Sequence, residues 1–268
     1  MALKQTIREF IRNLGVDDVG FASVADYHSP RSPKVESFFP GAKSIIVVAY
    51  KELSTCESPH MQLAMNGRLD RYAVVRYNSY LICHFLENEF QARVLSIPGG
   101  YTVDLTKDNP KGVSDFSLRH AAIAAGLGNF GRHNLVIHPT LGTRVTFSAI
   151  ITNLEMESDS KATQDFCTHC NICVDNCPAG ALNEEGLTDL RKCMSVSQPF
   201  GANSFLLYLD KFTNSGQEEK TQMLTSFSFL PFYQALSGAR EYNCFNCLKL
   251  CPALRDNSEP LQKSKMVG

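Results

Sequence analysis

Apolar residues at the start of the chain recur with helical spacing and then give way to two short, continuous apolar runs. Residues 3–14 place leucine, isoleucine and phenylalanine on one face and are followed by Gly15, so we expect an amphipathic helix that ends at a glycine C-cap. Residues 19–24 and 44–50 have the length and composition of strands, and the loop between them is rich in proline, serine and glycine. The pattern predicts one helix followed by two strands.

The rest of the first half continues this alternation. We expect a polar surface loop, a long helix, a strand, a second loop, an alanine-rich helix and two further strands at residues 51–68, 70–91, 92–97, 98–113, 117–125, 135–137 and 143–152. Alternating helices and strands indicate an α/β (α+β) fold. Cys56 and His60 lie in the first loop, where a surface loop is the simpler interpretation and metal ligation the alternative.

Cysteines at fixed spacing dominate the second half. Residues 167–178 are Cys-Thr-His-Cys-Asn-Ile-Cys-Val-Asp-Asn-Cys-Pro, which matches the bacterial ferredoxin ligand run C-x2-C-x2-C-x3-C-P. Residues 244–252 repeat this run without its first cysteine, because position 241 holds a glutamate. Cys193 is the nearby cysteine that can supply the missing ligand. The spacing therefore predicts two 4Fe-4S clusters.

The two runs are expected to share their ligands. In two-cluster ferredoxins the fourth cysteine of a run binds the other cluster. We therefore assign to the first cluster Cys167, Cys170, Cys173 and Cys251, and to the second cluster Cys177, Cys193, Cys244 and Cys247. The apolar stretch 205–240 is expected to exclude water from the clusters.

The polar stretch 155–163 is the predicted domain boundary. It separates an α/β cofactor and substrate domain, residues 1–155, from a small two-cluster ferredoxin-like domain, residues 156–268. Residues 178–182 are expected to begin a short helical turn.

Composition narrows the alternatives for the cysteines. With 268 residues, 44% of them hydrophobic and 20% charged, the chain can bury an ordinary core, whereas disulfide frameworks suit small secreted chains. Zinc sites usually combine separated Cys-x2-Cys pairs, which differ from a run that ends in Cys-Pro. Free thiols and oxygen-labile clusters favour the cytoplasm, and no apolar run is long enough for a membrane span.

The charge balance bears on partners. Lysine and arginine total 26 against 27 acidic residues, so binding of tRNA is not supported by net charge. Residues 126–131, Gly-Leu-Gly-Asn-Phe-Gly, match G-x-G-x-x-G, but the dinucleotide fingerprint requires a strand before the glycines and a helix after them. Here the glycines follow a helix, which favours a glycine loop around another ligand over a nicotinamide site.

These segments together resemble the epoxyqueuosine reductases and, more distantly, the reductive dehalogenases. The resemblance is carried by residues 19–22, 39–49, 71–73 and above all 125–133, followed by the strand 143–151 and the cysteine runs. It implies a nitroreductase-like fold that binds cobalamin between the first domain and the nearer cluster. By this resemblance, cofactor contacts are expected at Arg71, Arg119, Gly126, Gly128, Asn129, Phe130, Gly131, Arg132 and Asn134.

The implied activity is that of an iron–sulfur reductase. A low-potential donor such as ferredoxin or flavodoxin would reduce the clusters, and cobalamin would reduce a small-molecule or nucleoside substrate. Candidate proton donors are Asp115, His120, His133 and Tyr72. Family members that reduce epoxyqueuosine carry an acidic proton donor followed closely by proline, and Asp115 lies near that place but out of register. The alternative hypotheses are a non-enzymatic ferredoxin-type electron carrier or corrinoid-reducing partner, and a flavin-binding first domain.

Overall fold

A four-stranded antiparallel sheet forms the centre of the first half of the chain. The structure is a computed structural model that describes residues 2–99, 114–238 and 244–254. The strand order is β1 (Asp18–Ser23), β2 (Ser44–Lys51), β6 (Val145–Thr152) and β3 (Val94–Ile97), and each neighbouring pair is antiparallel. The expected mixture of helices and strands is confirmed, and the antiparallel pairing makes this part of the chain α+β.

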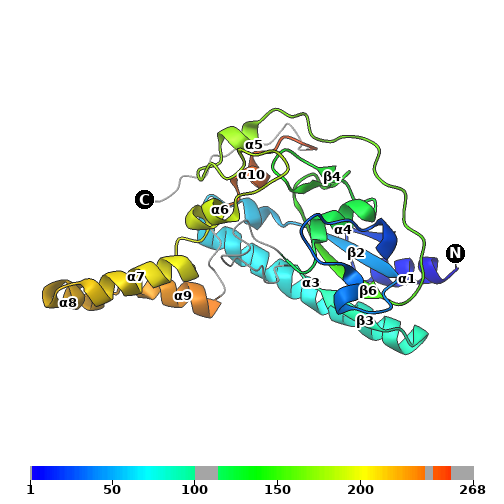
Figure 1. Cartoon of the computed structure of the whole chain (residues 1–268), viewed down its shortest axis with the longest axis horizontal. Helices are drawn as coiled ribbons and strands as arrows, with labels where there is room; N and C mark the ends of the chain where they lie inside the picture. Colours follow the sequence, from blue (N-terminus) through cyan, green and yellow to red (C-terminus); the bar gives the residue numbers. More distant parts are fainter. Residues whose placement is uncertain (1, 100–113, 239–243, 255–268) are drawn as a thin grey trace.

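Helices cover both faces of this sheet (Figure 1). One face, with Ile46, Val48 and Ile150, packs against α1 (Ala2–Asn13) and α3 (Met61–Phe90). The other face, with Ile45 and Val47, packs against the alanines of α4 (Leu118–Ala124). Because both faces are covered, β2 is buried along its length except for its last residue, which explains its continuous apolar run.

Shorter elements complete the first half. They are η1 (Val24–Asp26), α2 (Val35–Phe38), η2 (Ser54–Glu57), and a two-stranded ribbon of β4 (Asn129–Phe130) and β5 (Val136–Ile137). Gly15 adopts φ +76° directly after α1, as the predicted C-cap requires. Ser117 caps α4, and its side chain accepts a hydrogen bond from the main-chain N–H of His120. Most of the predicted loop 98–113, residues 100–113, lies outside the described residues.

Helix α3 begins nine residues before the start predicted from the sequence. Residues 61–68, expected to be part of a polar loop, form its first turns. Ala64 and Met65 are buried there against Phe245 of the second cysteine segment, and Gly67 lies against Thr55 of η2. The local sequence shows no apolar stripe because the partner of this part of the helix comes from far along the chain.

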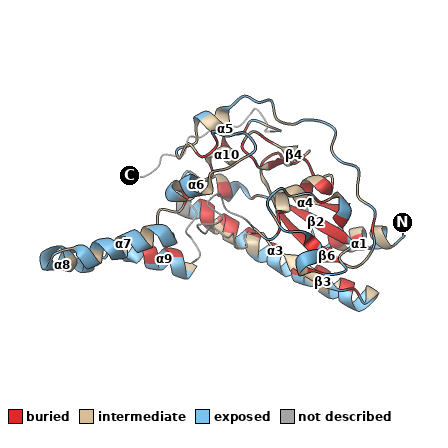
Figure 2. Cartoon of the chain, viewed as in Figure 1, coloured by how far each residue is buried: buried red, intermediate tan, exposed pale blue. Residues whose placement is uncertain are grey.

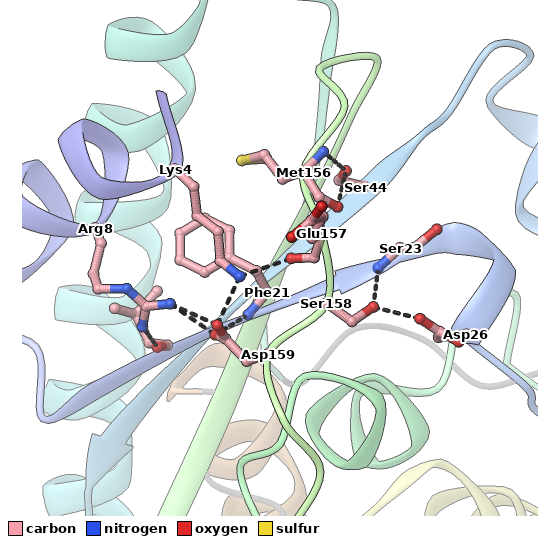
Figure 3. A network of polar contacts seen from close by, with 11 residues as sticks. Lys4, Arg8, Phe21, Ser23, Asp26, Ser44, Met156, Glu157, Ser158 and Asp159 are labelled. Carbon is pink, nitrogen blue, oxygen red and sulfur yellow. Dashed lines mark hydrogen bonds and ion pairs between the residues drawn. The ribbon is translucent and has the colours of Figure 1, made fainter. Parts of the chain in front are cut away.

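The predicted boundary segment crosses the outside of the first domain, where it is held by polar contacts (Figure 3). The Asp159 main-chain N–H donates to the carbonyl of Phe21 at 2.8 Å, and the Asp159 carboxylate accepts from the Phe21 N–H at 2.9 Å. The same carboxylate pairs with Arg8 at 2.8 Å and Lys4 at 2.7 Å. Residues 158–159 therefore extend the β1 edge of the sheet, and the division of the chain near residue 155 stays a prediction.

The second half contains the two cysteine segments and three longer helices. Helix α5 (Ile172–Asp175) of the first segment contacts α10 (Asn246–Lys249) of the second, and α6 (Leu190–Ser197) lies beside them (Figure 1). Residues 178–182, expected to start a helix, form turns instead. Among the described residues, no helix is both long and apolar enough to cross a membrane.

Helices α7 (Ala202–Asn214), α8 (Gln217–Thr225) and α9 (Leu230–Gly238) project away from the rest of the molecule (Figures 1 and 2). Residues 205–240 were expected to cover the clusters. In the described part of that stretch, α7 buries none of its residues, and Leu206, Leu207 and Phe227 are 63%, 63% and 72% exposed. The aromatic rings of this region pack on one another, and Phe232 contacts Phe200, Phe205 and Tyr208. The expectation of an apolar wall around the clusters was wrong.

Candidate functional site

Four thiols from both cysteine segments line one cavity. They belong to Cys167, Cys170, Cys173 and Cys251, and Arg132 and His133 of the first half complete the wall. Burial raises the pKa of the Cys173 thiol, and the neighbouring sulfur of Cys251 raises it further. The ligands predicted for the first cluster are therefore neighbours, although Cys251 is far from the others in sequence.

The remaining four cysteines of the cluster segments form a second group. Burial raises the pKa of Cys247 to about 12, with the nearby sulfurs of Cys244, Cys193 and Cys177 adding to the effect. Burial likewise raises the pKa of Cys244, and Cys193 and Cys177 again contribute. Cys193 is thus placed beside the second run, where the missing ligand is needed. Position 241, which lacks the expected cysteine, lies outside the described residues.

The donor sets have the chemistry of cluster ligation. None of the ten cysteines is in a disulfide, and each of the two groups offers four thiols, as a 4Fe-4S cluster requires. Across the described residues, no three His, Cys, Asp or Glu side chains converge on a point that could hold a single metal ion. Main-chain N–H groups of Arg132 and Ala181 donate to the sulfurs of Cys167 and Cys177, each at 3.3 Å. Such donors stabilise thiolates and tune cluster potentials.

Left-handed residues let the first cysteine run turn sharply. His169 has φ +51° and Asn171 has φ +59°, and Asn171 directly precedes the short helix α5. Cys167, Cys170 and Cys173 consequently point into one space, whereas Cys177 is carried to the second group.

Two residues that directly precede β6 hold the second cysteine segment against the first half of the chain. The Arg144 guanidinium donates to the main-chain carbonyls of Lys249 at 3.0 Å and Cys251 at 3.1 Å, and pairs with Glu57 at 2.6 Å. The Thr143 hydroxyl donates to the Leu248 carbonyl at 2.9 Å. Residues 143–144, which directly precede β6, therefore position the main chain around Cys251, and the two halves of the molecule are packed directly together.

A buried ion pair joins α3 to the end of β2 nearby. Glu52 accepts from Arg68 at 2.8 Å and also from Arg71, and each of these side chains is at most 9% exposed. The Arg68 guanidinium stacks over the ring of Phe245, 3.6 Å from its centroid. Burial acts to raise the pKa of Glu52, but the Arg68 and Arg71 charges outweigh it and hold the pKa below its usual value. Sequence reasoning missed Glu52 and Arg68, since each lies in a segment expected to be a loop.

Cys56, placed by sequence in a surface loop, is fully buried beside this ion pair. Burial and the Glu52 carboxylate raise the pKa of its thiol to about 11. His60 is exposed.

The glycine segment bends around the protein's own chain. A side chain at Gly126 would collide with the carbonyl of Ser160 in the boundary segment, and one at Gly128 would collide with that of Ile137. Both glycines have positive φ, of +76° and +137°. A side chain at Gly131 would lie 2.6 Å from Cε1 of His133. The segment follows α4 and contains β4, so a strand and not a helix comes after its first two glycines.

The three arginines expected to contact a cofactor differ in the hydrogen bonds that their guanidinium groups make. Arg119 donates to the Asn134 carbonyl at 2.5 Å, and Arg132 donates to the Leu182 carbonyl at 2.9 Å. Arg71 is 4% exposed, contacts Glu52, Thr146 and the Tyr72 ring, and leaves Nε and Nη2 without a partner among the described residues. Asn129 donates to the Gln164 carbonyl, and Phe130 packs edge-on against His120.

The four candidate proton donors lie in different surroundings. Asp115 is exposed just before α4, and Tyr72 lies under Arg71. Nδ1 of His120 is 2.7 Å from the Ser117 hydroxyl, and burial lowers its pKa to about 4, with the Arg119 charge acting in the same direction. His133 lines the first cysteine cavity. Within the described residues, no hydrogen bond or ring contact joins any two of the four.

Comparisons with known proteins agree with the motifs. Residues 163–183 match the family of 4Fe-4S binding domains. The chain is 24% identical to an epoxyqueuosine reductase of Bacillus cereus over 93% of its own length, and it spans 64% of that relative.

Solved structures share the fold. One is an epoxyqueuosine reductase with an epoxyqueuosine-modified tRNA stem loop, with a TM-score of 0.60 and 19% identity over 98% of this chain and 68% of the other. Another is a reductive dehalogenase described in terms of B12-dependent dehalogenation, with a TM-score of 0.53 and 17% identity over 92% of this chain and 31% of the other. The resemblance inferred from the motifs is thereby confirmed: this chain is similar in sequence and in fold to proteins named epoxyqueuosine reductases.

Proposed function

We propose that this protein is a reductase that passes electrons through two 4Fe-4S clusters to cobalamin, which then reduces a nucleoside-type substrate. The observation that carries the proposal is the sorting of eight cysteines into two groups of four, with Cys251 completing the first group and Cys177 and Cys193 joining the second. This crossed arrangement is what a two-cluster relay requires. The relatives named epoxyqueuosine reductases support the reductase activity.

The contacts between the two halves support electron transfer into the first domain. Arg144, Thr143 and Arg68 hold the second cysteine segment against β6 and α3, and Arg132 and His133 reach into the first cavity. A cofactor bound by residues of the first domain would consequently lie beside a cluster. A carrier protein would not need this enclosure of a cluster by a second domain.

Cobalamin would supply a strongly reducing metal centre for the substrate. For this cofactor the residues offer one clear donor set. Arg71 is buried and keeps two guanidinium nitrogens unpartnered within the described residues, and such groups are expected to meet an acceptor such as a corrin amide. Arg119 and Arg132 already donate to main-chain carbonyls and would mainly position the glycine segment.

A modified nucleoside is the substrate class that the relatives favour. One structural neighbour carries an epoxyqueuosine-modified tRNA stem loop. The net charge of −1 gives no overall attraction to a nucleic acid, so recognition of an entire tRNA would depend on local contacts. The nucleoside itself is therefore the first substrate to test.

The test uses the full-length protein, purified and reconstituted anaerobically with iron and sulfide. We expect roughly eight irons per chain. Addition of cob(II)alamin and a low-potential reductant should change its visible and electron paramagnetic resonance spectra, and epoxyqueuosine should then be converted to queuosine. Arg71→Met should weaken cobalamin binding, whereas Arg93→Met, at an exposed arginine near β3, should not.

The outcomes separate the alternatives. Unchanged cob(II)alamin spectra in protein that holds both clusters would leave an electron carrier, and a yellow chromophore that co-purifies would indicate flavin. Spectral change without conversion of epoxyqueuosine would retain the cobalamin reductase and exclude this substrate.

A further inference from the structure

His133 lies in the wall of the first cysteine cavity, although it belongs to the first half of the chain. It is 2% exposed and follows β4, in the turn that leads to β5. The ring is held across Gly131, where a side chain would approach Nε2 to 2.9 Å. The thiols of Cys167, Cys170, Cys173 and Cys251 line the same cavity. The imidazole is therefore fixed in place beside the four expected ligands.

The hydrogen bonds of His133 define where its proton is. Nδ1 accepts the main-chain N–H of Leu135 at 3.1 Å. A neutral imidazole carries one proton, so this proton must be on Nε2. Nε2 has no hydrogen-bond partner among the described residues. The residue that carries this buried N–H donor lines the cavity of the four thiols, and a buried donor is expected to have an acceptor.

We propose that the Nε2–H of His133 donates a hydrogen bond to a sulfur of the first cluster and raises the reduction potential of that cluster. A reduced cluster carries one more negative charge than an oxidised one, so a donor to sulfur stabilises the reduced state more. The backbone N–H of Arg132, which donates to Cys167, acts from the adjacent residue. The turn between β4 and β5, which carries Arg132 and His133, thereby sets how easily electrons enter the first cluster.

This inference rests on the first cluster of the proposed function and is independent of cobalamin and of the substrate. The test uses reconstituted full-length protein carrying Cys193→Ser, so that the first cluster is observed without the second. Three further changes are compared in this background. His133→Phe keeps a ring without a donor, His133→Gln keeps an N–H donor, and His28→Gln changes an exposed histidine outside both cysteine runs.

The readout is a redox titration followed by electron paramagnetic resonance of the reduced cluster. At a fixed potential, His133→Phe should lower the ratio of reduced to oxidised cluster about tenfold, which is a shift of about 59 mV to more negative potential. His133→Gln should restore most of this ratio, and His28→Gln should leave it unchanged. An unshifted reduction potential in His133→Phe with normal iron content would overturn this inference and leave the proposed function standing.

A second measurement on unsubstituted His133 covers the case in which His133→Phe does not hold a cluster. Pulsed electron paramagnetic resonance of protein labelled with ¹⁵N-histidine should show weak coupling to one ring nitrogen and to one exchangeable proton. Exchange of H₂O for D₂O should remove the proton coupling and leave the nitrogen coupling. Strong nitrogen coupling would mean direct iron ligation, and no coupling would mean no contact; either result refutes the hydrogen bond. Reconstituted protein that holds no iron would overturn the proposed function and this inference together.

Discussion

Arg144 is the residue whose loss should reveal how the first domain controls cluster assembly. Its guanidinium holds the carbonyls of Lys249 and Cys251 and pairs with Glu57, and its side chain is 16% exposed. Arg144→Met removes these contacts and keeps the apolar stem. Hydrogen bonds from a charged group contribute about 1.5–3 kcal/mol each. Because Arg144 retains some exposure, we expect a combined loss of about 3 kcal/mol in the free energy of unfolding.

For a chain of this size, such a loss corresponds to a fall of about 6–12 °C in Tm. The iron content should also fall from roughly eight toward roughly four per chain, because Cys251 loses its anchor while the second group keeps its four thiols. Calorimetry and an iron assay after anaerobic reconstitution measure both effects. Arg93→Met is the matched control, since Arg93 also donates to a main-chain carbonyl, of Pro40, at 3.4 Å on the exposed surface. Equal Tm and iron content in the two variants would refute a docking role for Arg144.

Two further predictions concern the second cluster and the buried ion pair. Cys193→Ser should reduce the iron content to roughly four per chain, whereas Cys83→Ser should retain roughly eight, and equal iron in both would remove Cys193 from the ligand set. Glu52→Gln should destabilise the fold by about 3–5 kcal/mol, because Arg68 and Arg71 stay charged and buried. Since the folded pKa of Glu52 is lowered, the stability it contributes is present above the usual carboxyl pKa and is lost as the pH falls through the lower folded value. Unfolding followed by circular dichroism across acidic pH should therefore show a flatter profile for the variant, and parallel profiles would contradict this assignment.

The sequence predicted those features that depend on spacing along the chain. Cysteine spacing indicated two groups of four thiols, and the neighbours of Cys193 and Cys251 agree with it. Apolar periodicity located α1, β1, β2 and β6 to within about two residues. The helix and strand positions depend on local backbone geometry, and the cysteine grouping follows from the ferredoxin ligand run.

Packing contacts between segments far apart in the sequence, which no motif marks, could not be predicted. Residues 61–68 looked like a loop because the helix they form packs against Phe245, which lies far along the chain. Glu52 gave no sign of burial, since its two arginine partners lie on α3. The stretch 205–240 is strongly apolar, yet composition alone did not distinguish a wall around the clusters from a separate helical arm with its own aromatic core.

The outward position of helices α7–α9 is compatible with where they lie between the cysteines. Helices α7–α9 lie between Cys193 and Cys244, two members of the second group. The entropic cost of closing a loop grows only slowly with its length, so an insertion at this place adds little to the cost of bringing these two thiols together. Residues 244–254 return against the first domain, where Arg144 and Thr143 fix their main chain. The positions of these thiols therefore depend on the contacts of residues 244–254 and little on the length of the segment before them, which allows α7–α9 to extend outward.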